Sequence, residues 1–196
     1  MNKKKTLPKA KATKPPKVFI SETMSGGQLA AMGPKTPLIT SLYGGAGFDT
    51  VIAGNANQYI SFAGDSIGGN LISVPSSKLL ATDTIIGGGG GNSDILQITG
   101  AGKYGPGTFS KVSGVEELSL SGASSVTLAS GSSFSTVIGG SAPGTLNASG
   151  STTPVTIDSS KVLKGGDTLI GSTQAPTTFI LSNAAELKAS VINATA

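Results

Sequence analysis

The stretch that decides the fold is Gly44-Gly45-Ala46-Gly47-Phe48-Asp49-Thr50-Val51-Ile52. Its glycines permit a tight turn that aims backbone carbonyl groups inward, and the Asp49 carboxylate adds a charged oxygen beside them. The residues after Asp49 alternate between polar and apolar, and a period of two predicts a short strand whose Val51 side chain enters a core. The stretch therefore predicts a glycine turn that runs directly into a buried strand.

Three further stretches repeat parts of this pattern. Residues 53–61 keep a glycine and the apolar position, but Gln58 stands where the aspartate is expected. Residues 88–96 repeat the pattern more fully, with one residue inserted before the aspartate, and residues 165–171 retain a remnant. The turn glycines and aspartates that we take as candidate metal ligands are Gly44, Gly45, Gly47, Asp49, Gly88, Gly89, Gly91, Asp94 and Asp167.

The first stretch matches the nonapeptide G-G-x-G-x-D-x-U-x at every fixed position, and here the sequence resembles the RTX family, the glycine-rich repeats of type I secreted bacterial proteins. The segment 112–120 is also similar to strands of bacterial surface-layer and adhesin-like proteins. The resemblance implies a β-roll in which turns from tandem repeats share Ca²⁺ ions, held by the nine residues named above. A reading without metal stays open, in which the glycines only make turns and Asp49 and Asp94 hydrogen-bond their own loops.

Apolar positions recur about every eight to twelve residues through the second half of the chain, with turn glycines between them. This spacing predicts an all-β fold, a β-roll or β-solenoid of short strands joined by glycine-rich turns. Leu118, Leu120, Val126 and Leu128 should face inward, and Ser119 and Thr127 should face solvent. A β-sandwich is the alternative fold, because it also uses short strands with turns at this spacing.

The composition divides the chain into four segments. Residues 1–17 hold seven of the 14 lysines and no acid, and they predict a disordered basic tail. Residues 18–43 form a transitional segment that glycine and proline pairs interrupt. Residues 44–182 form the β-repeat domain, and residues 183–196 form a short C-terminal helix or a tail.

The residue types that are absent restrict the chemistry. The sequence contains no His, Cys, Trp or Arg, which excludes a Ser-His-Asp triad, a Cys-His pair and a zinc site built on His or Cys. We therefore expect no enzyme activity and no small-molecule substrate. No apolar run approaches the roughly 20 residues that cross a bilayer, and no apolar stretch follows the basic N-terminus as in a cleavable signal peptide.

These features predict a structural protein that scaffolds rather than catalyses, located outside the cell or at the cell surface and exported without a cleavable signal peptide. Its partners would be further copies of itself or neighbouring surface proteins. The alternative is a virion or appendage component, such as a phage fibre or decoration protein. In either setting the lysine-rich tail can contact nucleic acid or an anionic surface.

Overall fold

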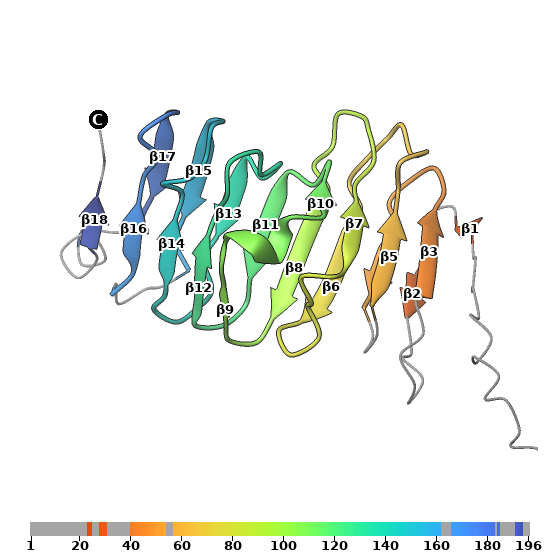
Figure 1. The fold of residues 1–196 in the computed structure, drawn as a ribbon, viewed down its shortest axis with the longest axis horizontal. Coiled ribbons are helices and arrows are strands. Elements are labelled where there is room, and N and C mark those ends of the chain that lie inside the picture. Colours follow the sequence, from red (N-terminus) through yellow and green to blue (C-terminus); the bar gives the residue numbers. More distant parts are fainter. Residues whose placement is uncertain are drawn as a thin grey trace, which may run out of the picture.

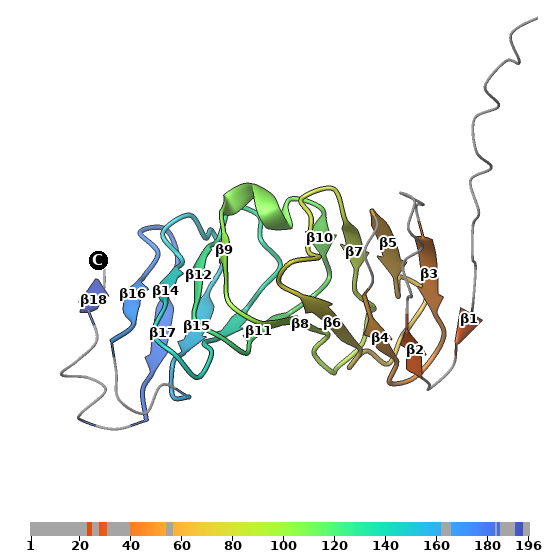
Figure 2. The same cartoon turned by 90° about the horizontal axis from the view of Figure 1, so that it is seen from below.

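The computed structural model describes residues 23–24, 28–30, 40–53, 57–161, 166–182, 184 and 191–193. These residues form an elongated parallel β-solenoid, with β1 near one end and β18 at the other (Figure 1). Two layers of strands lie face to face (Figure 2). The all-β solenoid that the sequence predicts is confirmed.

The strands belong to three parallel sheets. Sheet A contains β1 (Thr23–Met24), β3 (Thr40–Gly44), β5 (Gln58–Ser61), β7 (Thr84–Ile86) and β10 (Val112–Ser113). Sheet B contains β2 (Gln28–Ala30), β4 (Thr50–Ile52), β6 (Leu71–Pro75), β8 (Ile95–Thr99), β11 (Glu117–Leu120), β13 (Thr136–Ile138), β15 (Val155–Asp158) and β17 (Thr177–Ile180). Sheet C contains β9 (Gly102–Tyr104), β12 (Ser124–Thr127), β14 (Thr145–Asn147), β16 (Thr168–Ile170) and β18 (Val191–Asn193).

Sheet B runs the whole length of the solenoid and forms one layer, while sheets A and C share the other (Figures 1 and 2). A rung is one strand of sheet A or C followed by one strand of sheet B. Sheet B pairs in register at Gln28, Thr50, Leu71, Ile95, Glu117, Thr136, Thr156 and Thr178, so successive rungs differ by 19 to 24 residues. The period is thus longer than two nonapeptides and varies from rung to rung.

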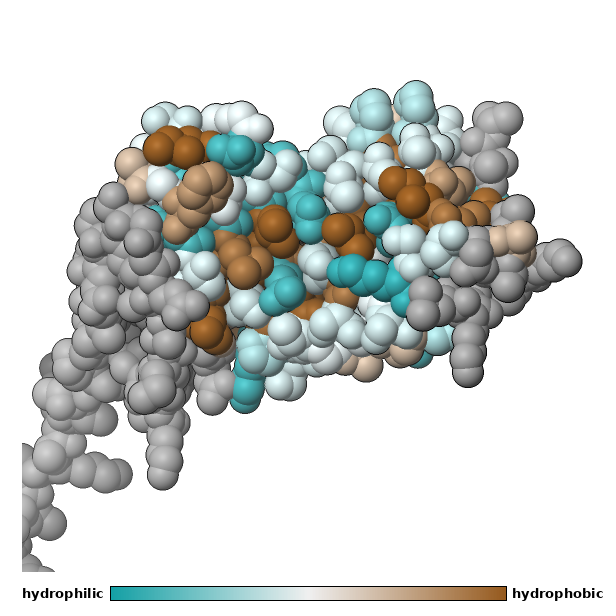
Figure 3. All heavy atoms as spheres, turned by 180° about the vertical axis from the view of Figure 1, so that it is seen from behind, coloured by the Kyte–Doolittle hydropathy of each residue, from teal (hydrophilic) through white to brown (hydrophobic). Residues whose placement is uncertain are grey.

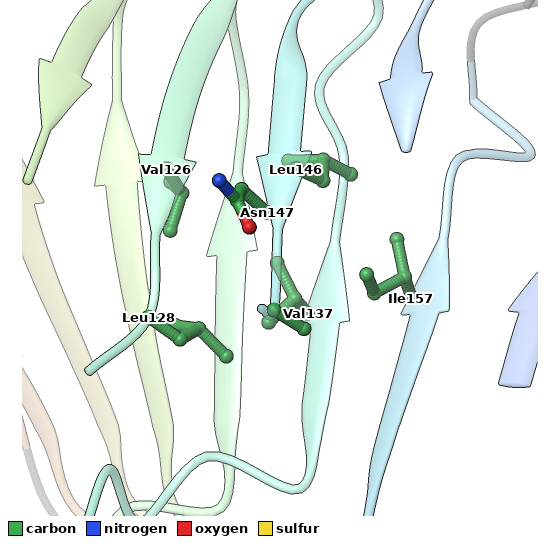
Figure 4. Close-up of a pocket in the computed structure, with 7 residues that line it drawn as sticks. Val126, Leu128, Val137, Leu146, Asn147 and Ile157 are labelled. Atoms are coloured by element: carbon green, nitrogen blue, oxygen red, sulfur yellow. The ribbon is translucent and has the colours of Figure 1, made fainter. Parts of the chain in front are cut away.

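Stacked aliphatic side chains fill the space between the layers. In sheet B one buried residue per rung lies in register with the next, in the order Val51, Ile72, Leu96, Leu118, Val137 and Ile157. Val126 and Leu146 of sheet C lie with Val137 and Ile157 in this space (Figure 4). Because each rung supplies its own inward residues, the core continues along the axis instead of closing around one centre.

One rung differs from the others because it contains strands of both sheet A and sheet C. The chain leaves β8, forms β9, then a 3-10 helix η1 (Pro106–Phe109), then β10, and re-enters sheet B at β11. Phe109 contacts Phe134 edge-on, with ring centroids 5.3 Å apart, and it lies 6.1 Å from Tyr104. These rings fill the wider core where the solenoid changes from sheet A to sheet C.

Several expectations can be compared with this architecture. Every strand pairing in the described residues is parallel, so the alternative of a β-sandwich, which pairs antiparallel strands, is wrong. The transitional segment 18–43 contributes β1, β2 and part of β3 to the stack. The tail 1–17 lies outside the described residues, as does most of the C-terminal segment 183–196; within that segment Val191–Asn193 form β18, which pairs with β16. In the described part, no helix is both long and apolar enough to pass through a membrane.

The predicted inward residues are buried as expected, since Leu118, Leu120, Val126 and Leu128 are all at most 2% exposed. Ser119 differs from its prediction. It is only 8% exposed, because its outward side chain lies in register between Gln97 on one neighbouring strand and Ile138 on the other. Thr127 is half-buried.

Candidate functional site

Three glycine-rich turns stack along one edge of the solenoid, where sheet A strands pass into sheet B. They span residues 44–49, 62–70 and 87–94, and we call this edge the glycine corner. The turns stack because β3, β5 and β7 pair with one another on one side and β4, β6 and β8 on the other. The first and third turns are the two best nonapeptide copies, and the second turn lies between them.

Polar side chains at the glycine corner link each rung to the next. The residues directly before β4, β6, β8 and β11 are Asp49, Asn70, Asp94 and Glu116, and these four residues form what we call the polar ladder. The backbone N–H of Asp49 donates to Asn70 Oδ1 (3.0 Å), that of Asn70 to Asp94 Oδ1 (2.7 Å), and that of Asp94 to Glu116 Oε2 (2.9 Å). The side chains of Asn70, Asp94 and Glu116 therefore each accept the N–H of the matching residue in the preceding rung.

Asn70 connects two carboxylates at the centre of the polar ladder. Its Nδ2 group donates to Asp65 Oδ2 (3.0 Å) and to Asp94 Oδ1 (2.9 Å). The orientation of the amide follows from the network, because Oδ1 accepts the Asp49 N–H and the nitrogen must then face the carboxylates. Asn70 is fully buried, and Asp65 and Asp94 are nearly so, so these bonds lie out of water, where an unpaired polar group would be costly.

Asp65 remains ionised by its hydrogen bonds. Burial raises the pKa of its carboxyl group, but hydrogen bonds from Ile67, Asn70, Gly47 and Gly68 outweigh burial and hold the pKa below the ordinary 3.8. Oδ1 accepts the N–H of Ile67 at 2.9 Å and that of Gly47, in the preceding turn, at 3.4 Å. The Asp65 carboxylate thus joins its own turn to the one before it.

The predicted glycines of the first turn serve close packing and hydrogen bonding. A side chain at Gly44 would collide with the ring of Phe62 in the next turn. The N–H of Gly45 donates to Asp49 Oδ2 (3.1 Å), and Gly47 has a positive φ of 111° that suits glycine.

In the second copy two of the three predicted glycines also donate hydrogen bonds. Gly88 N–H donates to Asp94 Oδ2 (2.5 Å), and Gly89 N–H donates to the carbonyl oxygen of Asp65 (2.7 Å). Gly91 is exposed, and a Cβ there would meet no other atom within 4 Å. Of the predicted residues, eight therefore lie at the glycine corner.

Asp167 lies elsewhere, because it precedes β16 in sheet C. Its Oδ1 accepts the N–H of Gly144 in the preceding rung (2.6 Å). Asp83, before β7, plays the same part for sheet A: it accepts the N–H groups of Gln58 and Leu80, both at 2.9 Å. Burial raises the pKa of Asp83 above 3.8, although these two hydrogen bonds act to lower it.

Sequence reasoning did not identify four residues of this network: Asp65, Asn70, Asp83 and Glu116. Three of these four share a signal in the sequence, since Asn70, Asp83 and Glu116 each stand directly before a strand. An Asp, Asn or Glu before an alternating segment is informative in a solenoid, because there the backbone N–H of one rung needs an acceptor from the next.

A calcium ion at the glycine corner would need about six to eight oxygen ligands. Within the described ranges, no group of three or more His, Cys, Asp or Glu side chains is arranged to hold a metal ion. Asp65 and Asp94 instead meet N–H donors, and the Asn70 amide nitrogen lies between them, where a shared cation would bind. In this arrangement the predicted ligands do not form a calcium cage, and calcium binding stays a prediction.

Comparison with protein-family models, with curated proteins and with solved structures finds no match to this chain.

Proposed function

We propose that this protein is an extracellular or cell-surface structural protein of the β-repeat type, which scaffolds rather than catalyses. The observation that carries the proposal is sheet B, whose eight parallel strands run from β2 to β17. The described chain is thus organised as one continuous rod. Rods of stacked rungs offer long side faces, which suit spacing and contact functions.

The use of the acidic side chains supports a structural role. The buried carboxylates of Asp65, Asp83 and Asp94 accept backbone N–H groups of their own or neighbouring rungs. A carboxylate held in this way is poorly suited to general acid–base work, which requires an oxygen within reach of a substrate proton. Together with a sequence that lacks His and Cys, this supports a protein without enzymatic activity.

The outer face of sheet B is suited to contact with neighbouring molecules. Hydrophobic side chains gather over the middle of this face, with hydrophilic ones among them (Figure 3). The apolar residues at its outward positions are Ile52, Leu71, Ile95, Ile138 and Ile180. Apolar side chains on an exposed sheet face favour association, so copies of this chain or other surface proteins are the partners that we propose.

The resemblance of residues 44–52 to RTX repeats supports an extracellular location and motivates the calcium prediction. The same rod is also compatible with a virion or appendage component, which is the second candidate. Both candidates make the protein part of a larger assembly.

Labelling of intact cells tests the proposal. Lys103, Lys111 and Lys161 are exposed, so a membrane-impermeant amine reagent should modify these lysines on cells that display the protein. A cytoplasmic marker protein should stay unlabelled in the same sample. Recovery of the unlabelled chain in purified phage particles would favour the virion candidate, and its recovery only in the soluble lysate would refute both.

A further inference from the structure

Two tyrosine rings lie on the outer face of sheet A. Tyr43 follows the buried Leu42 and Tyr59 precedes the buried Ile60, so alternation along each strand directs both rings outward. Tyr43 is 41% exposed, and its ring centroid lies 5.8 Å from that of Tyr59. The chain has only three tyrosines and no tryptophan, so this pair concentrates most of its large amphipathic rings at one place.

An open pocket of about 390 Å³ adjoins this pair of rings. Besides Tyr59, its lining offers the Asn57 amide, the hydroxyls of Thr82 and Thr84 and the Lys111 ammonium group; it also includes Gln58, whose side chain is only 4% exposed. Thr82 Oγ1 and Asn57 Oδ1 are 2.7 Å apart, a hydrogen bond that fixes part of the polar lining. The Ile85 N–H donates to the Lys111 carbonyl oxygen (3.0 Å), which holds Lys111 beside Thr84.

We propose that this surface binds an acidic polysaccharide. A tyrosine ring presents an apolar face that can stack on the C–H face of a sugar ring, and its hydroxyl group remains in water. Amide and hydroxyl side chains can both donate to and accept from sugar hydroxyls. The exposed Lys111 ammonium group is the partner for a carboxylate on the sugar.

The extent of the surface favours a chain of sugars over a single ring. Tyr43, Tyr59, Thr84 and Lys111 come from four successive rungs, and neighbouring strands are about 4.8 Å apart. The row therefore extends over about 14 Å. Single-stranded nucleic acid also stacks on aromatic rings, but it needs a basic groove along its phosphates. Only one lysine lines this pocket and its other polar groups are neutral, so the observations favour a ligand that is recognised mainly through hydroxyl groups, as a polysaccharide is.

A second pocket provides a matched control. It has a volume of about 420 Å³, lies at the start of sheet C and contains Lys103, but its other lining residues are Ala, Gly, Ser and Pro. Lys103 and Lys111 are both exposed. The two pockets thus share size and charge and differ in the aromatic ring and the exposed amide of Asn57.

Affinity electrophoresis of the full chain in gels that contain polygalacturonate tests the proposal. About 0.3 M salt should weaken contacts of the lysine-rich tail, and that tail is the same in every variant. We expect retardation of the wild type, a loss of affinity of about tenfold in Tyr59→Ala and in Tyr43→Ala, and a severalfold loss in Lys111→Gln. Lys103→Gln should migrate like the wild type, and far-UV circular dichroism should show that each variant is folded.

Three results would overturn the proposal. The first is that polygalacturonate does not retard the wild type. The second is that Lys103→Gln loses as much affinity as Lys111→Gln, which would indicate charge attraction alone. The third is that a single-stranded oligothymidylate or neutral dextran is bound as tightly as polygalacturonate, which would assign the surface to another class of ligand.

Discussion

At the scale of the residue, the amide of Asn70 sets the chemistry of the glycine corner. It fills the position that Asp49 and Asp94 occupy in the neighbouring rungs. A carboxylate there would face Asp65 and Asp94 without the two N–H groups that now bridge them. The amide therefore compensates two negative charges at a place where the nonapeptide pattern expects a third.

The variant Asn70→Asp tests this role. In the presence of a chelator it should lower the free energy of unfolding by about 3 kcal/mol, because a third buried carboxylate replaces two hydrogen-bond donors. Added calcium should recover part of this loss, since three stacked carboxylates would offer hard oxygen ligands. Urea unfolding followed by circular dichroism measures both effects.

The control for this variant is Ser93→Asp, which adds the same charge at an exposed position in the third turn and should change stability by no more than about 0.5 kcal/mol. Equal stability of Asn70→Asp and the wild type in chelator would show that the bridging amide does not matter. The wild type in the same experiment tests the calcium prediction, because a calcium-dependent rise in its urea midpoint would support binding by the native turns.

Asp65 should control how far the stability of the fold decreases at acid pH. Its pKa is lower in the folded state than in the unfolded chain, so its stabilising contribution is complete above about pH 4 and is lost as the pH falls through the folded pKa. Asp65→Asn should be less stable than the wild type at pH 7, yet it should lose less stability between about pH 5 and pH 2. Urea midpoints over this range measure the difference.

The pKa shift of Asp83 has the opposite sign, because burial raises the pKa of this carboxyl group. The contribution of Asp83 to the stability of the fold is therefore lost as the pH rises through that raised value. Asp83→Asn should therefore retain the acid sensitivity of the wild type. If Asp65→Asn and the wild type lost stability in parallel on acidification, the hydrogen bonds to Asp65 would not control its titration.

At the scale of the element, two glycines of one turn have different roles. Gly87 allows the rungs to pack closely, whereas Gly91 only takes part in the turn. A Cβ on Gly87 would collide with the carbonyl oxygen of Gly114 in the following rung, whereas a Cβ on Gly91 would meet no atom within 4 Å. Gly87→Ala should destabilise the protein by about 1–3 kcal/mol or more, because backbone must move. Gly91→Ala should be neutral or slightly stabilising, since it only restricts the unfolded chain. Thermal melting of the two variants compares them, and similar melting temperatures would argue against close rung stacking at this turn.

The strands themselves were predictable from alternation, but their assignment to rungs was not. The turn at 44–49 and the strand after it follow from glycine, aspartate and Val51, as expected. The next copy was sought at 53–61, where Gln58 begins β5 on the opposite edge of the solenoid. Its true counterpart is the turn 62–70, which carries Asp65 and Asn70. A nine-residue period could not locate it, because rungs of 19 to 24 residues change length from one to the next.

The sequence predicted which residues come together at the candidate site, but it did not predict their hydrogen-bond partners. Eight of the nine predicted ligands do meet at one edge, because the glycine turns stack. Their partners lie one rung away: Asn70 accepts the backbone N–H of Asp49 and donates to the Asp94 carboxylate, at separations of 21 and 24 residues. Local sequence alone does not specify which group lies at that distance.

At the scale of the whole molecule, stability should be divided among neighbouring rungs. Leu120 on β11 is 1% exposed and lies in register with Ile98 of β8. Leu120→Ala should cost about 2–5 kcal/mol, whereas Thr127→Ala on the outer face of β12 should cost no more than about 0.5 kcal/mol. Hydrogen exchange of Leu120→Ala should show lost protection mainly in β8, β11 and β13, with β3 and β5 little affected. Uniform loss from residue 41 to residue 181 would indicate a single cooperative core.

The direction of the bonds between rungs has a mechanical consequence. Strands lie across the rod and the hydrogen bonds between them lie along it, with the first and last strands at opposite ends (Figure 1). A pull on the two ends therefore loads the bonds of the terminal rung first, and that rung peels away before the next one bears the force. Each peeled rung would lengthen the chain by about 70 Å, at about 3.3–3.6 Å per residue. Under tension the molecule should thus extend in many small steps at low force, one rung at a time, instead of unfolding in a single event at high force.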